Sequence, residues 1–187
     1  METQLSVMTR SDLAEGLSAI GLRAGDVVCV HSSLSSLGMV IGGARTVIES
    51  LIEVVTMEGA ILMPTYSGDL SDPAEWRFPP VAEELWQKIR DQTPPFDPVL
   101  TPTRNMGAIP ELFRHFPLTR RSPHPQSSFT AWGKHRDLLV ERHPLDNRFG
   151  TNSPLGRLVD LHGRILLLGA PWVTISAFYL CLLYTST

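Results

Sequence analysis

The chain has few cysteines and no concentration of charge of either sign. It contains two cysteines in 187 residues, one of them, Cys29, within an apolar run, so no disulfide framework is expected and a reducing cytoplasm is favoured. The formal net charge is only -3, and the lysines and arginines are scattered along the sequence. This distribution argues against a nucleic-acid-binding protein.

Several catalytic and targeting motifs are also missing. None of the histidines forms a His-Glu-x-x-His pair, so we expect no metal site, and the absence of Gly-x-Ser-x-Gly argues against a Ser-His-Asp hydrolase. Residues 1–10 lack the apolar core of a signal peptide. Residues 165–184 carry no charge, but Gly169 to Pro171 divide them. A buried strand and a helix therefore explain this stretch better than a membrane anchor, and we expect a cytoplasmic protein without membrane contact.

Apolar periodicity predicts a single α/β domain. The composition, 43% hydrophobic and 19% charged, is sufficient for one sizeable core. Short apolar runs alternate with segments of helical period, which favours a mixed, largely parallel central sheet flanked by helices on both sides. Strands are expected at 27–31, 60–63, 127–132 and 165–168, the last as a central strand, and helices at about 12–20, 44–55, 81–91, 106–116, 134–142 and 153–161.

Two of these helices begin with a capping signal. Ser11 precedes a segment in which Leu13, Leu17 and Ile20 share one face, so we expect Ser11 to cap it. Ser153 is followed by proline, which is typical of a helix cap and first helical position. A helix start also attracts anions, so Ser153 is a candidate ligand contact as well.

Residues 67–106 interrupt the alternation of helices and strands. They contain seven of the fifteen prolines around one short helical segment, which predicts a long irregular excursion. Loops of this length are uncommon inside a compact domain unless they line a site. We therefore expect residues 67–106 to form a wall of a substrate cleft.

Two polar segments are candidates for ligand binding. His31 and the serines that follow it lie where the first buried strand ends, and open α/β sheets bind ligands at that edge. The alternative is a turn whose hydroxyls only cap backbone N–H groups. Residues 120–125, Arg-Arg-Ser-Pro-His-Pro, place two guanidinium groups and an imidazole on a stiff loop that suits an anionic ligand. The alternative there is a solvated pair of arginines.

Five segments, taken in order, resemble the aminoglycoside 3-N-acetyltransferase family. The resemblance covers about residues 13–178 and implies the antibiotic N-acetyltransferase fold. It also implies acetyl-CoA as co-substrate and transfer of its acetyl group to the 3-amino group of a 2-deoxystreptamine aminoglycoside. The segments are Val30-His31-Ser32-Ser33-Leu34, Met63-Pro64-Thr65-Tyr66, Pro95-Phe96-Asp97-Pro98, Arg120 to Pro125 and Asn152-Ser153-Pro154.

The resemblance assigns residues to two binding sites. Tyr66 and Asp97 are expected to contact the aminoglycoside, although Asp97 is also a typical turn former. The coenzyme A site is expected to contain His31, Ser32, Ser33, Leu34, Ser35, Arg121, Ser122, His124 and Ser153.

The resemblance ends near the carboxyl terminus. Tyr179 occupies the position of the family's general-base histidine, and a phenol with a reference pKa of about 10 is a poor base at neutral pH. We therefore assign no catalytic residue, and expect one domain over 1–179, incomplete at the C-terminus, with residues 180–187 as a non-native tail. Two alternatives stay open: a catalytically inactive coenzyme A-binding protein, and an acetyltransferase that acts on another amine.

Overall fold

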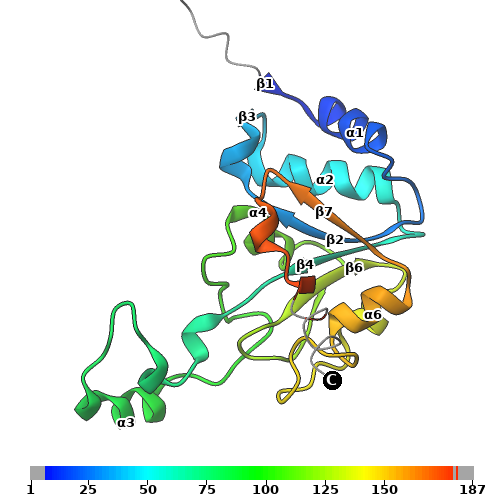
Figure 1. Ribbon diagram of the computed structural model, residues 1–187. Helices are drawn as coiled ribbons and strands as arrows, with labels where there is room; N and C mark the ends of the chain where they lie inside the picture. The colour runs from blue at the N-terminus through cyan, green and yellow to red at the C-terminus, as the bar shows by residue number, and fades with distance from the viewer. Residues whose placement is uncertain (1–6, 179, 181–187) are drawn as a thin grey trace, which may run out of the picture.

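A five-stranded mixed sheet forms the centre of the molecule. The computed structural model describes residues 7–178 and Leu180. The strand order is β5 (Arg120–Arg121), β6 (Phe129–Gly133), β4 (Ala60–Pro64), β2 (Val27–Ser32) and β7 (Arg164–Leu168). β2 is parallel to β4 and β7, whereas β6 is antiparallel to both β4 and β5. The predicted mixed α/β fold is confirmed, with helices on both faces of the sheet (Figure 1).

The alternating side chains of the strands fill two cores. In β4, whose residues are all buried, Ile61 and Met63 belong to one core while Ala60 and Leu62 belong to the other. Successive side chains of a strand point to opposite faces, so a sheet covered on both sides needs apolar residues at every position. The first core is covered by α1 (Arg10–Ala19), α2 (Gly43–Val55) and α4 (Ala108–Phe113), and the second by α5 (Arg136–Val140) and α6 (Pro154–Asp160).

The start of α1 differs from the prediction. Thr9 is the N-cap, and its hydroxyl accepts a hydrogen bond from the Asp12 amide while the Asp12 carboxylate accepts one from the Thr9 amide at 2.8 Å. This reciprocal capping box satisfies two backbone donors, which places Ser11 inside the first turn. Ile20 is 67% exposed, so the predicted apolar face consists of Leu13 and Leu17.

β7 lies at one edge of the described sheet, although the apolar run at 165–168 is typical of a central strand. It pairs with β2 from Val28–Arg164 to Ser32–Leu168. Leu166 is buried, while Ile165 is 39% exposed. Apolar periodicity reports which faces of a strand are covered, but carries no information about its lateral neighbours, so the run at 165–168 did not distinguish an edge from the centre.

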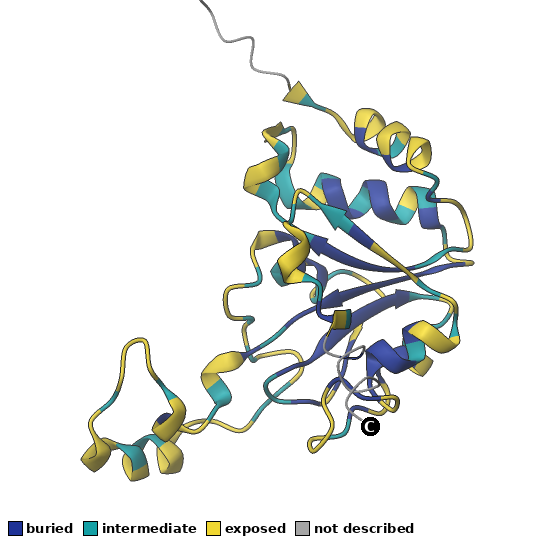
Figure 2. Ribbon diagram, in the orientation of Figure 1, coloured by how far each residue is buried: buried dark blue, intermediate teal, exposed yellow. Residues whose placement is uncertain are grey.

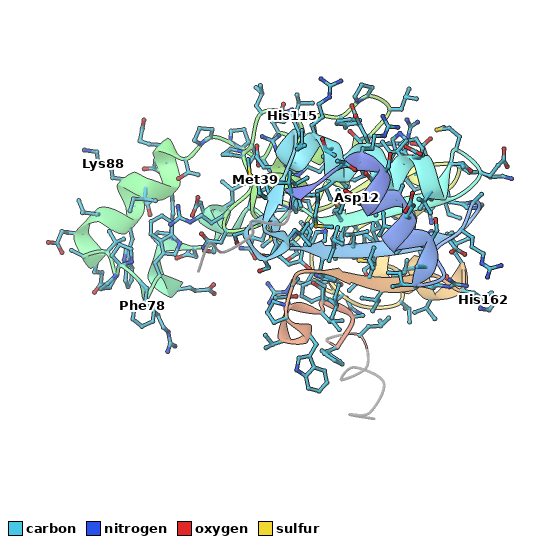
Figure 3. All side chains as sticks on the ribbon, turned by 90° about the horizontal axis from the view of Figure 1, so that it is seen from above. Asp12, Met39, Phe78, Lys88, His115 and His162 are labelled. Carbon is cyan, nitrogen blue, oxygen red and sulfur yellow. The ribbon has the colours of Figure 1, made fainter. Side chains whose placement is uncertain are left out.

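Residues 67–106 form the predicted irregular excursion. It contains two 3-10 turns, at Gly68–Leu70 and Pro73–Glu75, and the helix α3 (Glu83–Gln92). Every residue of α3 is at least partly exposed, as the yellow colouring in Figure 2 shows. Viewed from above, the α3 region projects away from the body, with Phe78 and Lys88 at its outer part (Figure 3).

Several short elements had no signal in the sequence. β1 (Val7–Met8) and β3 (Met39–Val40) form a parallel pair apart from the main sheet. Two 3-10 turns, η1 (Leu34–Leu37) and η4 (Trp172–Thr174), follow β2 and β7. In the described part of the chain, no helix is long and apolar enough to span a bilayer.

Mutation can show which of the two hydroxyl residues, Thr9 or Ser11, caps α1. Thr9→Ala should lower the free energy of unfolding by about 1 kcal/mol because it removes the capping hydroxyl, whereas Ser11→Ala, within the exposed first turn, should change it by less than about 0.5 kcal/mol. Urea unfolding followed by circular dichroism measures both. An equal loss in the two variants would contradict the observed cap.

Candidate functional site

A small cavity lies at the carboxyl ends of β2 and β4. Its volume is about 130 Å³, and its walls include His31 and Ser32 from the end of β2 and Tyr66 just after β4. Parallel neighbouring strands bring their carboxyl ends to one edge of the sheet, where such folds bind ligands. Residues from two other segments complete the lining: Asn105, Met106 and Pro110 beside α4, and Ala170, Thr174 and Ser176 after β7.

Ser32 contributes an available hydrogen-bonding group to this cavity. Its Oγ is buried and has no hydrogen-bond partner among the described residues, although a buried polar atom left unpaired costs about 1–3 kcal/mol. A ligand that hydrogen-bonds this hydroxyl removes that cost. The predicted ligand contact of Ser32 remains a prediction, and its buried hydroxyl is compatible with it.

His31 is a neutral imidazole at the same cavity. It is 4% exposed, and burial lowers its pKa to about 4. Its Nε2 lies 3.8 Å from the Sγ of Cys29, whose pKa burial raises to about 12. Both groups are thus uncharged at pH 7.

The remaining serines of this segment form a local turn. Ser33 Oγ lies 2.9 Å from Ser36 Oγ and 3.2 Å from Ser35 Oγ, while the Ser33 amide donates to the Leu168 carbonyl at 2.9 Å. Leu34 packs against the first core. The coenzyme contacts predicted for Ser33, Leu34 and Ser35 remain predictions.

Tyr66 connects the ends of β4 and β7. Its hydroxyl donates to Ser176 Oγ at 2.6 Å, and its ring makes an edge-to-face contact with Phe129 at a centroid distance of 5.4 Å. This bond holds the segment after η4 over the cavity. Tyr179, which occupies the predicted general-base position, lies outside the described residues.

Arg120 and Arg121 have different environments. Arg120 is exposed and pairs with Asp137 at 2.9 Å. Arg121 is only 6% exposed, and its guanidinium donates to the Thr65 carbonyl at 2.7 Å and to Ser128 Oγ at 2.9 Å. The alternative of a solvated arginine pair is therefore wrong for Arg121. Contact between Arg121 and a phosphate remains a prediction, and the geometry favours a structural role for this residue.

The loop after Arg121 contains a buried polar chain. The Nε2 of His143 donates to the Arg148 carbonyl at 2.7 Å; because that carbonyl only accepts, the Nδ1 of His143 is the acceptor of the Ser122 hydroxyl at 2.9 Å. Burial lowers the pKa of His143 to about 4. No sequence pattern pointed to His143, since a lone histidine in a loop has no partner at a fixed spacing.

His124 presents a second buried donor beside this chain. Its Nδ1 accepts hydrogen bonds from the amides of Gln126 and Ser127, both at 3.1 Å, so the proton is on Nε2. That Nε2 is buried and has no hydrogen-bond partner within the described residues. Burial, and then the charge of Arg148, lower its pKa. The rings of His124 and His143 are 4.6 Å apart between centroids.

Ser153 and Asp97 have the local structural roles that the sequence offered as alternatives. Ser153 is fully buried and accepts from the amides of Leu155 and Gly156 at 3.2 and 3.4 Å, which confirms the predicted cap. The Asp97 carboxylate accepts from the Val99 and Leu100 amides, which lowers its pKa. Asp97 lines a different cavity from Tyr66, one of about 400 Å³ within the irregular excursion. Binding of a ligand by either residue remains a prediction.

Comparison with known proteins places the whole fold in one family. The family model for aminoglycoside 3-N-acetyltransferases matches residues 29–181. The chain belongs to this family. The predicted resemblance is thereby confirmed, including its antibiotic N-acetyltransferase fold.

Two relatives illustrate the similarity in sequence. The SPbeta prophage-derived aminoglycoside N(3')-acetyltransferase-like protein YokD of Bacillus subtilis is 50% identical over 92% of this chain and 64% of its own length. Aminoglycoside N(3)-acetyltransferase VIII of Streptomyces fradiae is 39% identical over 92% of this chain and 59% of its own. The chain thus spans less than two thirds of the length of both relatives.

Solved structures of the family share the architecture. The crystal structure of YokD superposes with a TM-score of 0.96 at 46% identity, covering all of this chain and 70% of the other. AAC-IIIb in binary complex with CoASH superposes with a TM-score of 0.80 at 36% identity, over 94% of this chain and 64% of the other. AAC-VIa bound to sisomicin gives 0.82 at 32% identity, over the same 94% and 64%.

The buried histidines predict a loss of stability in mild acid. His31 and His143 have folded pKa values of about 4, below the unfolded value of about 6.5. The unfolded chain therefore binds more protons below pH 6.5, and stability, complete above that pH, should fall by about 2 kcal/mol per histidine by pH 5. His143→Gln should flatten this slope when urea unfolding is measured between pH 7.5 and 5. Equal slopes in the wild-type chain and His143→Gln would contradict the assignment.

Proposed function

We propose that this chain binds acetyl-CoA and forms the coenzyme-binding part of an N-acetyltransferase acting on the 3-amino group of 2-deoxystreptamine aminoglycosides. The cavity at the ends of β2 and β4 carries the proposal, because residues of two family-like segments, His31, Ser32 and Tyr66, meet there. Family membership supports the coenzyme, and the relative AAC-IIIb was crystallised with CoASH. The relative AAC-VIa was crystallised with sisomicin, which supports the acceptor class.

The available donors suit coenzyme A chemically. Ser32 Oγ and His124 Nε2 are buried and lack partners in the described part of the chain. Coenzyme A offers phosphate and amide oxygens, which accept hydrogen bonds from such groups. Ser32 and His124 are therefore the two residues that we assign first to coenzyme binding, ahead of the other residues predicted for that site.

Acetyl transfer also requires a base. An amine that is protonated in water must lose a proton before it attacks the thioester. Tyr179 stands where the family resemblance expects a histidine, and this residue is the reason for the second candidate function, a coenzyme A-binding protein without transferase activity. His31 is neutral at the cavity, but a pKa of about 4 makes it a weak base.

We infer a cytoplasmic location for this protein. The two cysteines suit a reducing compartment, and Cys29 is a buried free thiol. Acetyl-CoA as co-substrate agrees with that compartment.

Calorimetric titration with acetyl-CoA tests the proposed coenzyme site. The folded 187-residue chain should bind, and Ser32→Ala should weaken the affinity about two- to twelvefold, which corresponds to roughly 0.5–1.5 kcal/mol for one hydrogen bond. Ser18→Ala, an exposed serine on α1, should bind like the wild-type chain. The absence of binding heat from a demonstrably folded sample would remove the coenzyme assignment.

Thiol release from acetyl-CoA distinguishes the two candidate functions. With sisomicin as acceptor, the proposed transferase should release thiol faster than a reaction without acceptor, and His31 is then the first base to replace. A coenzyme A-binding protein without a general base should show no acceptor-dependent release, because loss of such a base typically costs 10²- to 10⁴-fold in rate.

A further inference from the structure

We propose that Arg121 is a positioning residue, which fixes the turn carrying Tyr66 and fastens the returning part of the irregular excursion to that same turn. The proposal rests on the proposed function at one point, the assignment of Tyr66 to the coenzyme and substrate site. The placement of Tyr66 itself is a property of the chain without ligand. It can be measured independently of any binding.

One nitrogen of Arg121 holds both neighbours of Tyr66. Its Nη2 donates to the Thr65 carbonyl at 2.7 Å and to the Ser67 hydroxyl at 3.1 Å. The Ser67 hydroxyl in turn donates to the Pro125 carbonyl at 2.6 Å. The residues on each side of Tyr66 are thus attached to the same buried side chain, Thr65 through its backbone carbonyl and Ser67 through its hydroxyl.

The other nitrogens of Arg121 reach two further segments. Nε donates to Ser128 Oγ at 2.9 Å, next to β6. Nη1 donates to the Thr101 carbonyl and lies 3.4 Å from that of Pro98, while the guanidinium lies 5.1 Å from the centre of the Phe96 ring. The returning part of the excursion, 96–101, is therefore bound to the end of β4 through one guanidinium.

The attachment of the 65–67 turn affects the candidate site because the side chain of Tyr66 lies there. Tyr66 lines the 130 Å³ cavity with His31 and Ser32, whereas the next residue, Ser67, lines the separate 400 Å³ cavity. The Tyr66 carbonyl also accepts from the Arg104 amide at 2.7 Å. A displacement of the 65–67 turn would therefore move the phenol that bonds Ser176.

Arginine is the residue type that this geometry requires. A guanidinium is planar and offers five donors in a fixed fork, whereas an ammonium is a single point of charge at the end of a flexible stem. The acceptors of Arg121 are carbonyl and hydroxyl oxygens on three sides of the fork. A phosphate could bind it only by displacing some of them. Lysine at this position keeps the positive charge but loses most of these bonds.

The test compares Arg121→Lys with Arg120→Lys, the same substitution at the exposed neighbouring position. The full chain is labelled with 3-fluorotyrosine, and the Tyr66 resonance is assigned from Tyr66→Phe. Arg121→Lys should shift or broaden that ¹⁹F resonance and accelerate hydrogen exchange of the Thr101 and Arg104 amides by about tenfold or more. Arg120→Lys should leave all three signals unchanged.

A second variant covers the case in which Arg121→Lys does not fold. Ser67→Ala removes one acceptor of Arg121 without changing any charge, and should shift the Tyr66 resonance in the same direction by a smaller amount. An unchanged Tyr66 resonance in the folded variant, whichever of the two is used, would overturn the proposal.

Acetyl-CoA titration of the same samples separates this proposal from the proposed function. Wild-type binding tests the coenzyme site, while the fluorine and exchange measurements contain no coenzyme. If Arg121→Lys weakened acetyl-CoA binding but left Tyr66 and the two amides unchanged, Arg121 would be a direct ligand contact and the positioning role would be wrong.

Discussion

The arrangement of the molecule depends on the pairing of β2 with a parallel strand on each side. β4 and β7 run in the same direction as β2, so the side chains that follow all three strands reach one edge of the sheet. β2 and β4 are buried on both faces, which leaves that edge as the place where polar side chains can accumulate without disturbing a core. Ser32 at the end of β2, Tyr66 after β4 and Ser176 after β7 line one cavity for this reason.

A second constraint acts at the end of β4, where consecutive side chains serve different purposes. Tyr66 faces the small cavity and Ser67 the larger one, so the turn between them separates the candidate site from the excursion. Burying a cation there is costly unless its donors are satisfied. Arg121 meets this condition by donating to carbonyl and hydroxyl oxygens from several segments. The same hydrogen bonds hold the 65–67 turn and the returning part of the excursion, 96–101, in place.

Sequence periodicity predicted the two-sided burial of the sheet, because a residue's preference for a core is a local property. It did not place β7 at an edge or β6 antiparallel to β4, since lateral pairing depends on segments far apart in the chain. The cap of α1 was misassigned to Ser11 because both Thr9 and Ser11 carry a suitable hydroxyl and the choice depends on the Asp12 carboxylate.

The candidate site shows the same division between local and distant information. Ser32 was predicted from its position after a strand, and its unpartnered hydroxyl agrees with that reasoning. The roles of Arg121 and His143 depend on hydrogen-bond partners contributed by other segments, which no spacing in the sequence reveals. Burial also changes the chemistry that residue type suggests: Arg121 directs its charge at protein acceptors, and the histidines become neutral hydrogen-bonding groups. Ser32 and His124, both predicted at the coenzyme site, thus present uncharged hydrogen-bonding groups held in place by the fold, and their contact with the coenzyme remains a prediction.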